Sequence, residues 1–97
     1  MMKKTAVIVN VGRGSVIDEA ALQAAIDDGT ISGAALDVYS EEPPKADSPI
    51  MNVKNKEKIV YTPHIAWGSV QARERCISMT ADNIKAFIEG KPLNDVI

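Results

Sequence analysis

Three polar residues that could act together in catalysis each follow a short apolar run of the sequence. Arg13 follows the first run, Glu42 the second and His64 the third. An arginine is always charged and can hold a carboxylate through two parallel hydrogen bonds. A histidine can exchange a proton with a reacting carbonyl oxygen, and a neighbouring glutamate favours its protonated form. Together these residue types suit the reduction of a 2-keto acid.

Each of these residues also has a simpler interpretation. Arg13 lies between two glycines and could be a solvated residue of an ordinary loop between a strand and a helix. A lone histidine such as His64 is more often structural, and Glu42 stands in a polar loop where a glutamate is usually solvated. Asp37 is harder to explain in this way, because a carboxylate inside an apolar segment needs a partner.

A parallel sheet would bring these residues together. Apolar runs at residues 6–9, 33–39 and 59–61 each predict a strand. Between the first two runs, Asp18 predicts the N-cap of a helix that stops at Gly29. Strand, helix and strand form a βαβ unit with an expected right-handed crossover. Because parallel strands end at the same edge of a sheet, the polar residues that follow them should converge on one cleft.

The remaining segments predict a long loop and a final helix. Residues 40–58 are polar and contain three prolines, which predicts a functional loop with one helical turn opened by Ser48-Pro49. Ser69 predicts the cap of a helix that runs to about Glu89. Its inner stripe recurs at steps of three and four and consists of Arg73, Cys76, Ile77, Thr80, Ile84, Phe87 and Ile88. We expect the cysteine in this stripe to be a small buried hydrophobe.

Composition excludes several classes of function. The chain has 97 residues, which allows at most one domain with a marginal core. It has 11 basic and 13 acidic residues, so no basic surface for nucleic acid is predicted. No apolar run approaches the ~20 residues of a membrane span, and we predict no secretory signal and no metal site. The single cysteine fits a reducing cytoplasm.

The predicted fold class is α/β, but only part of a Rossmann-like doubly wound sheet. Two main helices cannot cover both faces of three parallel strands. The glycine fingerprint G-x-G-x-x-G, which cradles a pyrophosphate after a first strand, is absent.

The sequence resembles the D-isomer-specific 2-hydroxyacid dehydrogenases, in the C-terminal part of their NAD-binding domain. The resemblance covers essentially the whole chain and rests on three motifs, which are Asn10–Gly14 followed by Asp18-Glu19 and Ala21-Leu22, Gly33–Pro43, and Thr62–Trp67. His-Ile-Ala-Trp at residues 64–67 is most similar to the glycerate dehydrogenase and hydroxypyruvate reductase branch. Glu42 argues against the formate dehydrogenase branch, which has glutamine there.

The resemblance implies hydride transfer between NAD or NADP and a short 2-keto acid or D-2-hydroxy acid. By this resemblance, Arg13 binds the substrate and polarises its carbonyl group, and His64 is the general acid–base catalyst. Glu42 pairs with that histidine. The resemblance also places Asp37 near the nicotinamide amide. The implied cofactor-binding residues are Val11, Gly12, Arg13, Asp37, His64 and Ala66.

Family members are considerably longer than this chain. The resemblance therefore implies that residues 1–97 are the C-terminal half of a dinucleotide-binding domain, without the substrate domain, the glycine-rich half and the residue that reads the ribose. We expect a cytoplasmic, homodimeric parent enzyme and an inactive isolated chain. The alternative is a non-catalytic interaction or self-associating module, because half a sheet exposes an apolar edge and face.

Overall fold

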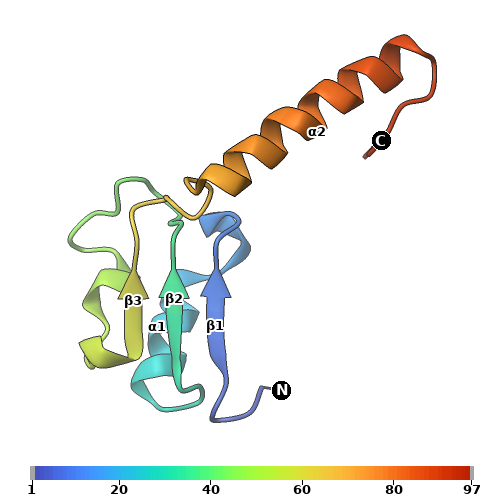
Figure 1. Cartoon of the computed structure of the whole chain (residues 1–97). Coiled ribbons are helices and arrows are strands. Elements are labelled where there is room, and N and C mark those ends of the chain that lie inside the picture. Colours follow the sequence, from blue (N-terminus) through green and yellow to red (C-terminus); the bar gives the residue numbers. More distant parts are fainter. Residues whose placement is uncertain (1, 97) are drawn as a thin grey trace. The chain divides into compact units, whose positions relative to one another are not determined.

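The computed structural model describes residues 2–96, which divide into two compact units between Ala66 and Trp67 (Figure 1). The first unit holds a parallel sheet and one α-helix, and the second holds a single long α-helix. The regular elements are β1 (Val7–Asn10), α1 (Glu19–Asp27), β2 (Gly33–Leu36), β3 (Ile59–Tyr61) and α2 (Val70–Ile88). Short 3-10 turns occupy Gly14–Val16, Pro49–Asn52 and Lys56–Lys58.

The three strands form one parallel sheet in the order β1-β2-β3, as the sequence predicts. Their register aligns the last residues of the strands, because Asn10 pairs with Leu36 and Leu36 pairs with Tyr61. The chain therefore leaves all three strands at the same edge of the sheet, where the arrowheads lie level in Figure 1. This alignment places the segments that follow the strands next to one another.

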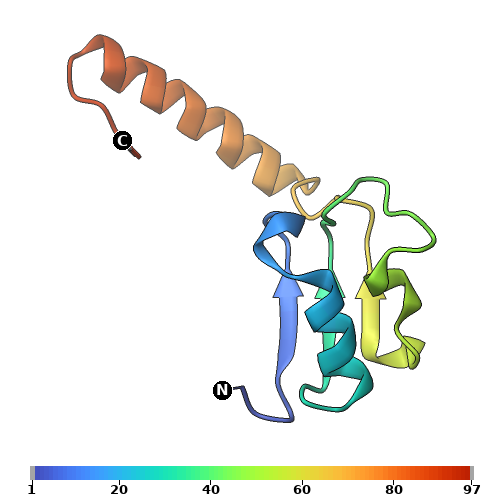
Figure 2. The ribbon, with the colours of Figure 1, turned by 180° about the vertical axis from the view of Figure 1, so that it is seen from behind.

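Helix α1 covers one face of the sheet (Figure 2). Asp18 caps it as predicted, since its Oδ1 accepts hydrogen bonds from the N–H groups of Ala20 and Ala21, each at 3.0 Å. Gly29 ends it with a φ of 76°, which glycine adopts at little cost. The core between helix and sheet consists of Leu22, Ile26, Ile31, Ala34, Leu36, Tyr39, Ile50, Val53 and Ile59.

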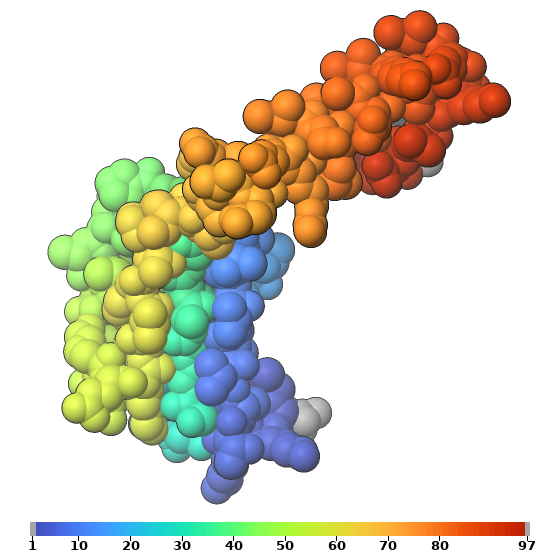
Figure 3. All heavy atoms as spheres, viewed as in Figure 1, coloured from blue at the N-terminus to red at the C-terminus, as the bar shows by residue number. Residues whose placement is uncertain are grey.

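The opposite face of the sheet is apolar and exposed. Side chains alternate along a strand, so β1 directs Ile8 toward the core and Val7 and Val9 away from it. Val9 is 66% exposed, and Val60 of β3 is 59% exposed. In Figure 3 the atoms of the three strands themselves form the visible surface of this unit. The predicted half-covered sheet is therefore confirmed.

Strand β2 is shorter than the prediction of residues 33–39. It ends at Leu36, and Val38 and Tyr39 are buried in the turn that follows it. The Asp37 carboxylate accepts hydrogen bonds from the turn after β3, and the Tyr39 N–H donates to the Glu42 carboxylate. These side-chain partners replace the strand ladder, and an apolar run alone does not reveal them.

Helix α2 begins and ends where the sequence predicts, but its predicted inner stripe is not buried. Ser69 caps the helix, since its Oγ accepts a hydrogen bond from the N–H of Ala72 at 3.1 Å. Within the stripe, Ile77 is 72% and Phe87 75% exposed, and Cys76 is an exposed free thiol. The expectation of a buried cysteine is therefore wrong. Helical periodicity predicts which side chains share a face, but it does not say what covers that face.

Neither α-helix of the described residues combines the length and the apolar character that crossing a bilayer requires.

Candidate active site

Arg13, Glu42 and His64 line one cavity of about 410 Å³ in the first unit. The other lining residues are Gly14, Ser15, Tyr39 and Ser40. All of them belong to segments that follow β1, β2 or β3, so the predicted convergence of the polar residues is confirmed. Their chemical roles stay predictions at this point.

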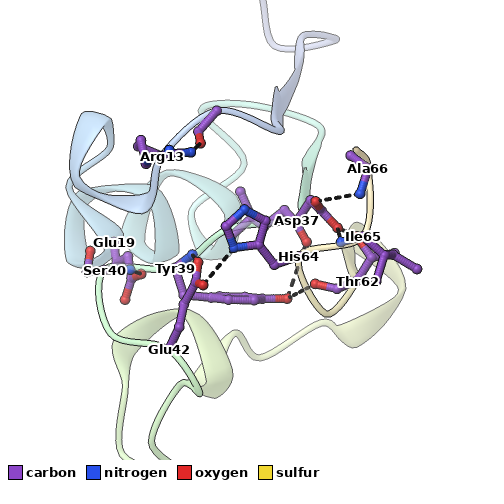
Figure 4. Close-up of polar contacts among 12 residues, drawn as sticks. Arg13, Glu19, Asp37, Tyr39, Ser40, Glu42, Thr62, His64, Ile65 and Ala66 are labelled. Atoms are coloured by element: carbon purple, nitrogen blue, oxygen red, sulfur yellow. Dashed lines mark hydrogen bonds and ion pairs between the residues drawn. The ribbon is translucent and has the colours of Figure 1, made fainter. Parts of the chain in front are cut away.

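The central contact of the cavity joins His64 to Glu42 (Figure 4). The His64 Nδ1 lies 2.7 Å from the Glu42 Oε2. Because a carboxylate only accepts, Nδ1 must carry the hydrogen, and Nε2 is left to exchange a proton with a substrate. The other carboxylate oxygen of Glu42 accepts a hydrogen bond from the N–H of Tyr39 at 3.1 Å. Glu42 is thus fixed on one side and faces the imidazole with the other.

The electrostatics of the pair favour an ionised glutamate. The hydrogen bond to His64, followed by the hydrogen bond from the Tyr39 N–H, holds the pKa of Glu42 below its usual value of 4.5. The positive charge of Arg13 lowers this pKa further. Glu42 therefore faces the imidazole as a carboxylate that accepts the Nδ1 hydrogen bond.

Arg13 lies on the loop that follows β1 and is exposed. Its guanidinium Nη1 donates to the carbonyl oxygen of Gly12 at 2.8 Å, which leaves its other N–H groups to bind an anion (Figure 4). Asn10, a residue that sequence reasoning missed, closes this loop. Its Nδ2 donates to the Arg13 carbonyl oxygen at 2.8 Å, and its Oδ1 accepts from the Gly12 N–H at 3.1 Å. The signal in the sequence is a polar side chain at the end of an apolar strand, directly before a glycine loop.

Gly14 sets the distance between the Arg13 loop and the loop that carries Glu42. A Cβ at this position would lie 1.9 Å from the carbonyl carbon of Tyr39 and 2.3 Å from the backbone nitrogen of Ser40. Neither atom can move without shifting the backbone, so the close approach requires glycine. The two loops are therefore in direct backbone contact, which brings Arg13 to the cavity that Glu42 and His64 line.

Asp37 holds the turn that carries His64. Its side chain is buried, and its Oδ1 accepts hydrogen bonds from the Thr62 hydroxyl and from the N–H of Ile65 at 2.9 Å. Its Oδ2 accepts from the N–H of Ala66 at 2.9 Å. His64 itself has a φ of 55°, which is uncommon for a side chain of this size. The partner that this buried carboxylate needs is therefore the turn that carries His64.

These bonds make the stability of the chain depend on pH. The Thr62 hydroxyl, and less strongly the N–H groups of Ala66 and Ile65, hold the pKa of Asp37 below its usual 3.8. A lowered folded-state pKa stabilises the fold above the unfolded-state value, and this contribution is lost as the pH falls through the folded-state value. We expect the urea midpoint to fall as the pH is lowered from neutrality through the usual value of 3.8 and below it.

Asp37→Asn should lower the urea midpoint at pH 6 and flatten this pH dependence. An amide presents one acceptor oxygen and turns an N–H group toward one of the backbone donors. Asp47→Asn is the matched control, since Asp47 makes no hydrogen bond or ion pair among those described here. A variant at position 37 that keeps the full pH dependence of the wild type would contradict this account.

The remaining predicted cofactor residues are close in sequence to residues that line the cavity. Val11 is exposed and Gly12 follows it, both between the end of β1 and Arg13. Ala66 ends the first unit, and its N–H donates a hydrogen bond to the Asp37 carboxylate. Contact of these residues with a cofactor stays a prediction. Among residues 2–96, no three His, Cys, Asp or Glu side chains are grouped so as to hold a metal ion.

Comparison with known proteins places this geometry in a family. Residues 1–66 match the profile of the family described as D-isomer specific 2-hydroxyacid dehydrogenase, NAD binding domain. The glycerate dehydrogenase of Methylorubrum extorquens is 44% identical over 95 residues, which are 98% of this chain and 30% of that protein.

Solved structures agree with the sequence comparison. An acyclic imino acid reductase in complex with NADPH and D-Arg superposes with a TM-score of 0.75 at 35% identity, over 99% of this chain and 29% of that chain. An NADPH-dependent glyoxylate/hydroxypyruvate reductase from Sinorhizobium meliloti gives a TM-score of 0.65 at 38% identity, over 93% of this chain and 28% of that one. The chain thus spans less than a third of the length of these relatives.

Proposed function

We propose a function from the premise that this chain belongs to the D-isomer specific 2-hydroxyacid dehydrogenase family. The chain supplies the catalytic side chains for the NAD- or NADP-dependent reduction of a short 2-keto acid, and for the reverse oxidation of a D-2-hydroxy acid. The observation that carries this proposal is the 2.7 Å contact between His64 and Glu42 in a cavity that Arg13 also lines.

The residues divide the reaction between them. Arg13 binds the carboxylate of the keto acid and polarises its carbonyl group. His64, protonated and hydrogen-bonded to Glu42, gives its Nε2 proton to the carbonyl oxygen as a hydride reaches the carbonyl carbon. The C=O double bond becomes a C–O single bond, and one proton and one hydride are consumed. In the oxidation, neutral His64 takes the hydroxyl proton.

The residues present fit the nicotinamide end of a dinucleotide. A bound nicotinamide cofactor would supply or accept the hydride. The Asp37 Oδ2 accepts one described hydrogen bond and retains capacity for an amide N–H. Val11, which follows β1, offers an exposed apolar side chain. The residue that reads the adenosine ribose in this family is not among the 97 residues, so the cofactor that we propose is NAD or NADP.

The substrate that we propose is glyoxylate or hydroxypyruvate. The Sinorhizobium meliloti relative is named for glyoxylate and hydroxypyruvate, and the Methylorubrum relative is named for glycerate. The cavity at Arg13 is bordered by the small hydroxyl residues Ser15 and Ser40. A cavity of about 410 Å³ also suits a small acid together with one ring of a cofactor.

We further propose that the whole protein is a cytoplasmic homodimer. The exposed Cys76 thiol is compatible with a reducing compartment, and the exposed valines of the sheet provide apolar surface that another part of the assembly could cover. Membership of an enzyme family supports the oxidoreductase over the alternative of a purely structural interaction module.

The test is turnover in an enzyme in which this chain replaces the matched segment of the Methylorubrum glycerate dehydrogenase. We expect this segment-replacement enzyme to oxidise NADH or NADPH when hydroxypyruvate or glyoxylate is offered, and less readily with pyruvate. The 97-residue chain alone, of verified intact mass, is the control and should be inactive. A replacement enzyme that folds and binds the cofactor but shows no turnover with any of the three acids would refute the proposal.

A further inference from the structure

Glu19 connects the start of helix α1 to the loop that carries Glu42. Its Oε1 accepts a hydrogen bond from the backbone N–H of Ser40 at 2.7 Å. Its Oε2 accepts one from the hydroxyl of Ser48 at 2.9 Å. Both carboxylate oxygens are therefore bound to the loop after β2, at two points eight residues apart in the sequence. Figure 4 shows the Ser40 contact beside the Glu42–His64 pair.

The contact at Ser40 acts on the segment that orients Glu42. The N–H groups of Tyr39 and Ser40 are consecutive along the backbone, and each donates to a different carboxylate. The first donates to Glu42 and the second to Glu19. A shift of this segment would move the donor that fixes the Glu42 Oε1, and with it the oxygen that faces His64.

Helix α1 is a suitable anchor for this contact. Leu22 and Ile26 bury the helix against the sheet, and Asp18 caps its first turn. Glu19 is the first helical residue, where the helix dipole favours a negative charge. By contrast, Glu41, next to Glu42, forms an ion pair with Lys45 in which both side chains are more than half exposed, so that pair contributes little to the loop's position.

We propose that Glu19 is a positioning residue for the Glu42–His64 pair. Its carboxylate spans from α1 to Ser40 and Ser48 and thereby fixes the loop in the conformation in which Glu42 meets the imidazole. The effect on catalysis rests on the proposed function, whereas the effect on the Glu42–His64 contact does not.

His64 provides a direct readout, because it is the one histidine in the 97-residue sequence. Its imidazole nitrogens give a single set of NMR signals. The chemical shift of these signals in Glu42→Gln is the reference for a disturbed Glu42–His64 contact. Glu19→Asp keeps the charge at the helix N-terminus but is one methylene too short to span the same distance. Glu19→Gln keeps the reach and loses the charge, and its amide can accept from Ser40 and donate to the Ser48 hydroxyl. Glu41→Gln is the control for loss of a charge on the same loop.

We expect Glu19→Asp to displace the His64 signal in the direction of the Glu42→Gln reference, while Glu19→Gln and Glu41→Gln stay at the wild-type position. If Glu19→Asp leaves the signal unmoved while only the thermal midpoint falls, Glu19 is merely structural and the proposal is wrong. The proposal is also wrong if Glu19→Gln displaces the signal and Glu19→Asp does not, because charge rather than reach would then matter.

Kinetics separate this inference from the proposed function. In the segment-replacement enzyme, Glu19→Asp should lower kcat roughly tenfold, since small misplacements of catalytic groups are costly, and leave KM for the keto acid within about twofold. A displaced His64 signal together with an inactive wild-type replacement enzyme would refute the proposed function and leave the positioning role standing. If the wild-type replacement enzyme turns over normally but Glu19→Asp leaves the His64 signal unmoved, the proposed function stands and the positioning role of Glu19 is refuted.

Discussion

Replacing His64 by alanine should lower kcat for 2-keto acid reduction by roughly 10²- to 10⁴-fold in the segment-replacement enzyme. The substitution removes the proposed proton donor to the carbonyl oxygen, and among the described side chains that line the cavity there is no other imidazole. Arg13 stays in place, so KM should change little. Steady-state oxidation of NADH or NADPH with hydroxypyruvate provides both constants.

Two further measurements test whether the loss of kcat is catalytic rather than a folding defect. His64 is partly exposed, so alanine at this position removes little buried surface and should leave the thermal midpoint near that of the wild type, within a few degrees. Glu42→Gln should lower kcat less than His64→Ala, because the imidazole remains but loses its ionised partner. A His64→Ala enzyme that retains a tenth or more of wild-type kcat would show that the proton comes from elsewhere.

Replacing Arg13 by alanine should lower kcat/KM about a hundredfold or more, through a higher KM and a lower kcat together. Two charge-assisted hydrogen bonds to the substrate carboxylate would be lost, each of about 1.5–3 kcal/mol. The kinetic pattern should therefore differ from that of His64→Ala, in which KM is spared. The Arg13 side chain is exposed and bonds only to the Gly12 carbonyl among the contacts described, so folding should be unaffected.

Arg13→Lys is the informative companion to this variant. Lysine keeps the charge but cannot present two parallel N–H groups, so it should recover only part of the lost kcat/KM. Full recovery by lysine would mean that the charge alone matters, and an unchanged KM in Arg13→Ala would exclude Arg13 from substrate binding.

The sequence predicted the sheet well because each strand has a strong local signal. The apolar runs end at polar or turn residues, and Asp18 and Gly29 mark a helix between them through their own backbone preferences. Parallel pairing then follows from the length of the crossover, and with it the convergence of Arg13, Glu42 and His64. The pattern of three strand ends is therefore enough to bring the candidate residues to one edge of the sheet.

The contacts that assemble the site could not be predicted in the same way. Glu19 binds Ser40 and Gly14 approaches Tyr39 across more than twenty residues of sequence, and neither contact leaves a periodic signal. Asp37 was correctly expected to need a partner, but its partners are mostly backbone N–H groups, which every residue carries. The prediction that the stripe of α2 is buried fails for a related reason, because periodicity shows which side chains share a face but not what surrounds that face.

The shared edge of the three strands also determines how the site can form during folding. Val7 pairs with Gly33 and Ala34 with Ile59, so each strand pairing closes a loop of roughly 25 residues and neither can begin as a local hairpin. Helix α1 can form from local interactions, but Arg13, Glu42 and His64 come together only when both long-range pairings are complete. A partly folded chain can therefore be strongly helical and still lack the candidate site. Recovery of the His64–Glu42 contact after dilution from denaturant would report the pairing of β2 with β3 rather than the formation of helix α1.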